Sequence, residues 1–392
     1  MTATIKPTAE QISQTRQAID SYIQSIDTHP HRRVGAYPYY RFHEADTPIR
    51  GTVLIFHGFS AKPDQMWRLA DYLFQNGYNF YQCSLAGHPW VPPSQYWPQV
   101  DLKPEIYNPL REKVAQDPVL STYFANLAAS NGKFQRPSFQ ERQALVARLM
   151  ELDPRLLDIA KAIRKSNDPD FDRCFTSSHM NYLENARDRL RELDAMPGPI
   201  YTVGLSVGGA VALALAADRS DRIQRVVAYA PLLRIYGKER REYVMLSGPL
   251  DISELGWDPN LRFPVGCLTA ADRFGSSAIL TSPAIRALKR IPTFLVLTEN
   301  EDAADIETSQ TFFKKIGGRG QGHCSYLYPA KDLVPHPMVD PTEVSQGMSN
   351  RFWRSLYQET FRFLDTAKVD TSNMSNLELD PNLPAVPPVE KS

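Results

Sequence analysis

The sequence predicts an α/β protein, with a mostly parallel, doubly wound sheet and a large, mostly helical insertion. Two observations predict the sheet: short apolar, β-branched runs alternate with amphipathic helical patterns, and turn residues separate them. A third predicts the insertion, because one long segment lacks this alternation. Strands that alternate with helices form parallel sheets covered on both faces. Ligands of such sheets bind beyond the carboxyl ends of the strands, so residues that follow a strand are the first candidates for a site.

The expected strands are short runs buried within the sheet. The run Gly51-Thr-Val-Leu-Ile-Phe56 is apolar and β-branched, as expected for a strand covered on both faces. Strands are expected over 37–43, 51–56, 78–84, the run that ends before Ser206, 222–229, 292–298 and 324–328. Helices are expected over 8–27, 63–76, 138–165, 180–193, the segment that follows Ser206, and 348–364.

The order of these elements divides the chain into a core and its additions. An N-terminal helical extension is expected over 1–33, and the core over 34–89 and 175–365. The cap insertion is expected over 90–174, and a second excursion over 231–290 is expected to add to the cap. The tail covers 366–392. The tail is rich in Asn, Asp, Pro and Ser and is expected to be disordered.

Charge and cysteine usage exclude several function classes. The 392 residues contain 44 Lys and Arg and 44 Asp and Glu, and this balance argues against capture of nucleic acid or of anionic membrane. The four cysteines are widely separated, which favours neither a zinc site nor a disulfide framework. The sequence shows neither a secretory signal nor a run of about 18 apolar residues, so a cytoplasmic protein without a transmembrane segment is expected.

The most informative motif is Gly204-Leu-Ser206-Val-Gly208, which lies between an apolar run and an Ala-rich helical segment. A serine flanked in this way is typical of a nucleophile elbow, a sharp strand-to-helix turn that lifts the hydroxyl above the sheet. The two glycines are expected where a Cβ would crowd the backbone. Ser206 is therefore the predicted nucleophile, and it lies at a helix N-terminus, where backbone N–H groups stabilise negative charge.

The remaining parts of a serine-based site can be sought around this turn. The backbone N–H of Val207 follows the nucleophile and is one expected oxyanion donor. The second donor should come from the loop after 51–56, and Phe59 N–H is the prediction because Gly58 lets that loop turn close to a ligand.

A carboxylate is needed to orient the base, and the run that follows 292–298 supplies four. They stand in Glu299-Asn-Glu301-Asp302-Ala-Ala-Asp305, and Asp302 is the predicted acid, with Asp305 and Glu299 as alternatives. Most of the four are expected to be solvated loop charges, and Asp305 is also placed to cap the next helix.

The base is expected to follow the acid along the chain. Only His323 and His336 do so. His323 precedes the run 324–328 and so lies at the wrong end of that strand, whereas His336 lies in a loop beyond its carboxyl end. His336 is the predicted base, while His57 and His88 are expected to be structural or substrate-facing.

With these residues in order, the chain resembles the α/β-hydrolase superfamily over roughly 34–365, outside the two excursions. The resemblance lies in His57-Gly-Phe, Leu85-Ala-Gly-His, Gly204-Leu-Ser-Val-Gly-Gly, the Asp302 loop and Val334-Pro-His. It departs from the superfamily where Gly-His-Gly is usual and this chain has Gly87-His88-Pro89, at the start of the insertion. A serine at the elbow disfavours the dehalogenase and epoxide-hydrolase chemistry that related enzymes perform with an aspartate.

The resemblance implies a serine hydrolase that cleaves carboxylic esters, including those of apolar acyl groups, through an acyl-enzyme. No metal or organic cofactor is implied, and the partner is a small-molecule acyl substrate. Aromatic residues of the insertion, such as Trp90 and Trp97, are candidates for an apolar lid, or for ordinary core packing of the cap. A thioesterase, an amidase or peptidase, an acyltransferase and a non-catalytic binding protein of the same fold are the alternatives.

Overall fold

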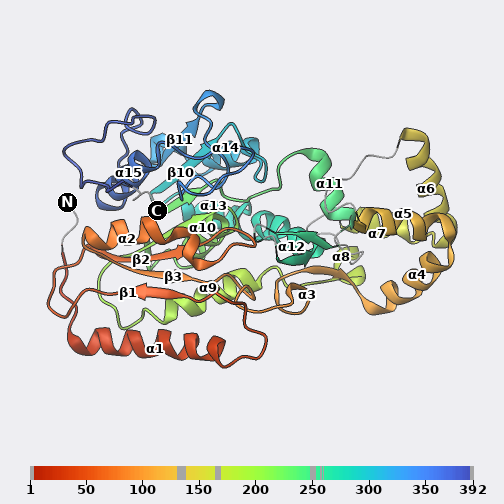
Figure 1. Cartoon of the computed structure of the whole chain (residues 1–392), viewed down its shortest axis with the longest axis horizontal. Coiled ribbons are helices and arrows are strands. Elements are labelled where there is room, and N and C mark those ends of the chain that lie inside the picture. Colours follow the sequence, from red (N-terminus) through yellow and green to blue (C-terminus); the bar gives the residue numbers. More distant parts are fainter. Residues whose placement is uncertain are drawn as a thin grey trace.

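The computed structural model describes residues 4–129, 138–163, 169–247, 253–256, 258 and 260–388. The molecule is elongated, with the sheet and its covering helices at one end and a helical lobe at the other (Figure 1). The first helix, α1 (Ala9–Asp27), and the last, α15 (Trp353–Thr366), both lie at the sheet end in this view.

The core is one sheet of seven strands in the order β1-β3-β2-β6-β7-β10-β11. The strands are β1 (Tyr39–Arg41), β2 (Gly51–Phe56), β3 (Tyr78–Cys83), β6 (Ile200–Leu205), β7 (Ile223–Tyr229), β10 (Thr293–Thr298) and β11 (Cys324–Tyr328). Only β1 runs antiparallel to its neighbour within this sheet. The predicted fold class, a mostly parallel sheet, is therefore confirmed, and each strand lies within or beside its expected range.

Alternate residues of the central strands enter two separate hydrophobic clusters. Val53 and Ile55 of β2 pack on one face, whereas Leu54 and Phe56 pack on the other. Because successive side chains of a strand point to opposite faces, a continuous apolar run is what burial on both faces requires.

Helices cover both faces of the sheet. The first cluster contains residues of α1 (Ala9–Asp27), α9 (Asn181–Arg191), α10 (Val207–Asp218), α13 (Ser282–Leu288) and α14 (Ile306–Lys315). The second contains residues of α2 (Trp67–Gln75) and α15 (Trp353–Thr366). The expected helix over 8–27 begins at a capping box, in which Thr8 and Gln11 satisfy each other's backbone N–H groups.

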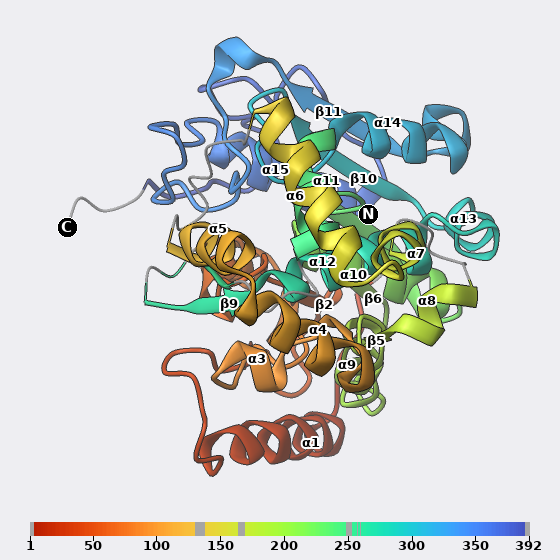
Figure 2. The same ribbon diagram turned by 90° about the vertical axis from the view of Figure 1, so that its right-hand side faces the viewer.

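The helical lobe is built from both excursions (Figure 2). The first contributes α3 (Pro93–Tyr96), α4 (Pro104–Gln116), α5 (Pro118–Ala129), α6 (Phe139–Leu152), α7 (Leu156–Ala162) and α8 (Pro169–Cys174), and the second contributes α11 (Lys238–Ser247) and α12 (Val265–Phe274). Leu102, Leu110 and Phe171 of the first share a hydrophobic cluster with Ala270 and Met245 of the second.

Two short antiparallel ribbons in the lobe were not among the expected strands. They pair β4 (Val100–Leu102) with β5 (Phe175–Ser177), and β8 (Ser253–Leu255) with β9 (Arg262–Pro264). Three-residue strands give too few alternations for their pattern to stand out in the sequence.

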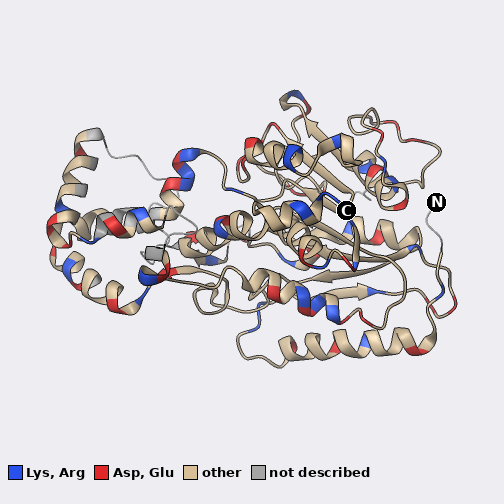
Figure 3. Ribbon diagram, turned by 180° about the vertical axis from the view of Figure 1, so that it is seen from behind, with Lys and Arg blue, Asp and Glu red and all other residues tan. Residues whose placement is uncertain are grey.

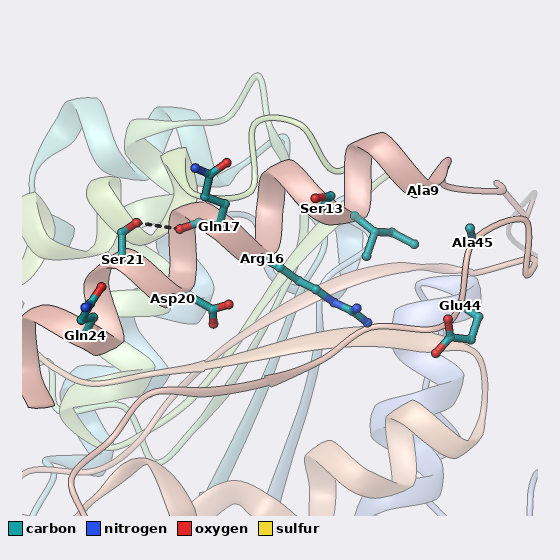
Figure 4. Close-up of a pocket in the computed structure, with 10 residues that line it drawn as sticks. Ala9, Ser13, Arg16, Gln17, Asp20, Ser21, Gln24, Glu44 and Ala45 are labelled. Atoms are coloured by element: carbon teal, nitrogen blue, oxygen red, sulfur yellow. Dashed lines mark hydrogen bonds between the residues drawn. The ribbon is translucent and has the colours of Figure 1, made fainter.

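Charges of both signs are mixed over the core and the lobe, in keeping with the zero net charge (Figure 3). Within the described residues, no helix combines the length and the apolar character needed to cross a bilayer. A groove lies between α1 and residues 44–45, lined mainly by polar side chains such as Arg16, Asp20 and Glu44 (Figure 4). Its lining includes none of the predicted site residues.

The C-terminal tail differs from the expected disorder as far as residue 388. Met374 and Val386 are fully buried in the same cluster as α2 and α15. Ser375 Oγ donates to Asp332 Oδ2 at 2.8 Å, and Gln358 Nε2 of α15 donates to Asp380 O at 3.0 Å. The polar composition of the tail led to the prediction of disorder, because only a few scattered apolar residues pack against the core.

We expect Met374→Ala to lower the free energy of unfolding by about 2–5 kcal/mol, the usual cost of emptying a buried methionine site. Leu377→Ala is the matched control, because Leu377 is 62% exposed and should change stability by less than about 0.5 kcal/mol. Urea denaturation of both variants measures the difference. Equal stability of the two variants would show that the tail does not pack.

Candidate active site

Ser206 lies in a strained turn between β6 and α10. Its backbone has φ +58° and ψ −120°, a region that non-glycine residues rarely adopt. The Ser206 N–H donates to Tyr229 O of the neighbouring strand at 2.9 Å, which anchors the turn to the sheet. A Cβ on Gly204 would overlap the Gly208 carbonyl, and one on Gly208 would overlap the His57 carbonyl. Both glycines are therefore required for the elbow predicted at Ser206.

The loop that follows β2 lies against this turn. A Cβ built on Gly58 would be 3.7 Å from Ser206 Cβ. In the described part of the chain, neither the Phe59 N–H nor the Val207 N–H has a hydrogen-bond partner. Two unpartnered backbone donors on the loops beside one serine hydroxyl are what an oxyanion hole requires.

His57 orients the peptide group that carries the Phe59 N–H. Leu85 N donates to His57 Nε2 at 3.1 Å, so Nδ1 carries the proton, and Nδ1 donates to Gly58 O at 2.8 Å. Burial lowers the pKa of His57 to about 3, so the ring stays neutral in this arrangement. Holding the Gly58 carbonyl turns the N–H of the same peptide group, that of Phe59, the opposite way. His57 thus has the structural role, one of the two expected for it.

Gly58 N–H, in the same loop, already has a side-chain partner. Gln65 Oε1 accepts from Gly58 N at 2.7 Å, and Gln65 Nε2 donates to both carboxylate oxygens of Glu343 at 2.9 and 3.1 Å. Glu343 in turn is near enough to His336 to raise the pKa of that histidine. Hydrogen bonds therefore join the loop after β2 to Glu343, whose charge acts on His336.

His336 contacts a carboxylate, but the carboxylate is that of Glu301. His336 Nδ1 lies 2.6 Å from Glu301 Oε1, and the Glu301 side chain is 1% exposed. The contact is short without forming an aligned hydrogen bond at Nδ1. Glu301 Oε1 also accepts from the backbone N–H groups of Asp302, Ala303 and Ala304 at 3.1, 2.9 and 2.9 Å.

Asp302, the predicted acid, therefore does not hold the His336 ring in this structure. Asp302 is exposed, and its Oδ2 accepts from Gln346 Nε2 at 2.8 Å and from Ser345 Oγ at 3.3 Å. The alternatives are also engaged elsewhere. Asp305 caps α14 by accepting from Thr308 N at 2.7 Å, and Glu299 accepts from Ala330 N at 2.8 Å. Glu301 is the residue that sequence reasoning missed.

The two ionisable partners shift each other's pKa in opposite directions. Burial would raise the pKa of Glu301, but the facing His336 and the backbone N–H groups outweigh it and lower that pKa. Burial would lower the pKa of His336, but Glu301, with Asp302 and Glu343, outweighs it and raises that pKa. The pair thus favours an ionised carboxylate beside a histidine that readily accepts a proton.

Backbone contacts bring Glu301 and His336 together. Asn300, next to Glu301, forms a parallel bridge with Pro335, next to His336. Thr298 Oγ1 donates to Val334 O at 2.5 Å, which fastens the histidine loop to the end of β10. His323 was not chosen as the base because it precedes β11. It is buried, and its two ring nitrogens contact Thr293 N and Ile316 O, as expected of a structural residue.

Ser206 and His336 lie at the same edge of the sheet, but no hydrogen bond joins them among the described residues. Ser206 is 4% exposed and the His336 side chain 12% exposed.

A wall of aromatic rings lies beside the Phe59 loop. The Phe59 ring meets Trp97 of the first excursion and Phe263 of the second edge-on, with centroids 5.5 and 4.9 Å apart. Trp97 also stacks on His88 at 3.7 Å. Trp97 is therefore buried against the Phe59 loop, as expected for a core residue of the cap.

One cluster in the described residues has the composition of a metal site. Ligand atoms of Glu301, Asp302 and His336 lie within 4.8 Å of one another. His336 Nδ1 and Glu301 Oε1 already contact each other, and Oε1 is occupied by three backbone donors. This donor set fits a carboxylate–histidine pair better than it fits a cation.

No family model matches the chain, and no curated protein is similar to it in sequence. Solved structures that are similar include one described with the metagenome-derived lipolytic enzymes LipS and LipT, at 15% identity over 84% of this chain and 98% of the other, with a TM-score of 0.49. A soluble variant of monoglyceride lipase from Saccharomyces cerevisiae is 12% identical over 87% and 100%, with a TM-score of 0.47. A monoacylglycerol lipase of Paleococcus ferrophilus is 13% identical over 85% and 99%, with a TM-score of 0.42.

These similarities are weak, and the fold is best defined by the chain's own features. The mostly parallel sheet and the serine at a sharp strand-to-helix turn are features of the α/β-hydrolase fold, the predicted fold class.

Proposed function

We propose that this protein is a serine hydrolase that cleaves carboxylic esters, with Ser206 as nucleophile, His336 as base and Glu301 as the carboxylate that orients the base. The buried His336–Glu301 pair carries the proposal, because it supplies a proton acceptor at the sheet edge that bears the strained serine. Phe59 and Val207 N–H groups are the proposed oxyanion donors.

In the proposed reaction, His336 takes the Ser206 hydroxyl proton as the oxygen attacks the ester carbonyl. Glu301 stabilises the imidazolium that forms, and the two N–H groups stabilise the negative oxygen of the tetrahedral intermediate. His336 then gives the proton to the departing alcohol, which leaves an acyl group on Ser206. Water activated by His336 releases the acid and restores the serine.

A fluorophosphonate probe followed by peptide mapping tests this proposal. We expect one stoichiometric label on Ser206, with loss of activity in proportion. A panel of ester, thioester and amide substrates that share one acyl group then separates an esterase from a thioesterase, an amidase or peptidase, and alcohol acceptors test for acyl transfer. Absence of both labelling and turnover would instead indicate a binding protein.

An apolar acyl group is favoured by the aromatic wall. Phe59 carries one proposed donor and packs on Trp97 and Phe263, so an acyl chain bound beside the oxyanion hole would meet aromatic rings. Ser206 is only 4% exposed, so we expect the cap or the loops around the serine to move when such a substrate enters.

The pH profile of kcat/KM should reflect His336. The base must be neutral to accept the serine proton, and the pKa of His336 is raised above 6.5, so kcat/KM should rise with pH along a limb whose midpoint exceeds 6.5. Asp302→Asn should lower this midpoint slightly, because Asp302 helps to raise that pKa, whereas Glu299→Gln is a control expected to leave it unchanged. A wild-type midpoint below 6.5 would contradict the proposed pairing.

A further inference from the structure

Arg33, at the end of the N-terminal extension, is a buried cation beside the proposed oxyanion loop. It is 4% exposed. Its Nη2 donates to Ser60 O at 2.7 Å and its Nη1 to Ala61 O at 2.9 Å. Its backbone N–H donates to Pro89 O at 2.6 Å, where the first excursion begins.

The charge of Arg33 is only loosely compensated. Its carboxylate partner, Asp258 of the second excursion, is 3.4 Å from Nη2, and Arg33 Nε has no hydrogen-bond partner among the described residues. Burying a guanidinium costs free energy unless ion pairs and hydrogen bonds compensate its charge. The residue that it holds, Ser60, has φ +59°, so this turn needs external support to persist.

Two peptide groups connect Arg33 to the Phe59 N–H. In the first, Ser60 O accepts from Arg33, and the N–H of Ala61 in the same group donates to Gly58 O at 3.3 Å. In the second, that Gly58 carbonyl is joined to the N–H of Phe59. Each peptide group is planar, with its C=O and N–H pointing in opposite directions, so fixing one end fixes the other.

We propose that Arg33 is a positioning residue that keeps the Phe59 N–H directed at the oxyanion through these two peptide groups, and that Asp258 links this arrangement to the cap. The proposal rests on the proposed function. The guanidinium also lies 5.7 Å from the centre of the Trp97 ring, and Lys62, in the same loop, pairs with Asp258 at 3.8 Å. Both excursions therefore contact the residue that holds the oxyanion loop.

Arg33→Met tests the proposal, with Arg33→Lys as the conservative variant. Arg32→Met is the matched control, because Arg32 is the neighbouring residue, is half-exposed and pairs only with Asp27 at 3.7 Å among described carboxylates. We expect Arg33→Met to lower kcat per titrated active site by about 10–100-fold, with KM changed less than about threefold, because an error of about 1 Å in a catalytic group costs about this much. Arg33→Lys should recover part of the loss.

A p-nitrophenyl ester and its thionoester analogue separate positioning from general destabilisation. Sulfur accepts hydrogen bonds poorly, so the ester-to-thionoester ratio of kcat/KM should fall in Arg33→Met and stay at the wild-type value in Arg32→Met. Asp258→Asn should lower the ratio less than Arg33→Met does, since both carbonyl contacts remain.

Hydrogen exchange gives a readout that does not depend on activity. Peptides covering 58–62 should exchange faster in Arg33→Met than in Arg32→Met. If wild-type protein hydrolyses neither ester, the proposed function fails. In that case, equal hydrogen exchange of residues 58–62 in Arg33→Met and Arg32→Met would also overturn the role of Arg33. If wild type is active, an unchanged kcat and an unchanged thionoester ratio in Arg33→Met overturn the positioning role alone.

Discussion

Ser206→Ala is expected to lower ester turnover by about 10⁵–10⁶-fold, the usual cost of removing a serine nucleophile, and to abolish fluorophosphonate labelling. The loss should appear in kcat, because the oxyanion donors are backbone N–H groups of Phe59 and Val207 that this substitution leaves in place. Residual catalysis from those donors alone should remain above the reaction in water. Stopped-flow assays with a p-nitrophenyl ester measure the wild-type turnover, and long-incubation assays measure the residual turnover of the variant.

A second substitution at this position separates chemistry from folding. Ser206 has φ +58°, so alanine inherits the strain of the turn whereas glycine relieves it. We expect Ser206→Gly to be more stable than Ser206→Ala by about 1–2 kcal/mol, with both inactive. Turnover by Ser206→Ala within tenfold of wild type, in a protein that melts normally, would exclude Ser206 as nucleophile.

Features that arise from local sequence could be predicted. The strand, turn and helix around Ser206 depend on residues adjacent in the chain, so one motif predicts the observed turn, and the proposed roles of Ser206 and Val207 follow from it. The proposal of His336 as base used local order in the same way, because position relative to one strand distinguishes it from His323. The Phe59 prediction relied on the same rule, since the loop after β2 lies at the carboxyl edge of the sheet.

The choice of carboxylate could not be made in the same way. The four acidic residues of this loop are chemically alike, so the choice depends on which side chain points toward His336. That orientation depends on a long-range backbone contact, the bridge between Asn300 and Pro335. That bridge places the following residues, Glu301 and His336, side by side. One local feature was available: the Glu301 carboxylate accepts hydrogen bonds from the N–H groups of the three residues that follow it, so its orientation is fixed by its own loop.

The cap and the tail could not be predicted in detail, for related reasons. The Leu102–Ala270 cluster joins residues far apart in sequence, and the tail is anchored by single apolar residues such as Met374 in a polar stretch. Arg33 was equally invisible, because an arginine in a loop is normally solvated and only the fold reveals that it is buried.

Glu301→Gln has the second large expected effect, a fall in kcat of about 10³–10⁴-fold. The amide oxygen can still accept from the backbone N–H groups of Asp302, Ala303 and Ala304, so the loop should keep its shape. The same oxygen contacts His336 Nδ1, so the amide oxygen would still face the ring, but the negative charge that stabilises the imidazolium would be lost. The imidazolium forms when His336 takes the Ser206 proton, so the loss should fall on the chemical step.

Asp302→Asn is the decisive companion, because it makes the same chemical change one residue away. The Asp302 carboxylate is exposed and bonds Gln346 and Ser345, so this variant should keep kcat within about threefold of wild type. If Asp302→Asn were the inactive variant and Glu301→Gln the active one, the assignment predicted from the sequence would hold instead. Equal, moderate losses in both would mean that the two carboxylates act together through their negative charge near His336, and that Glu301 has no separate role.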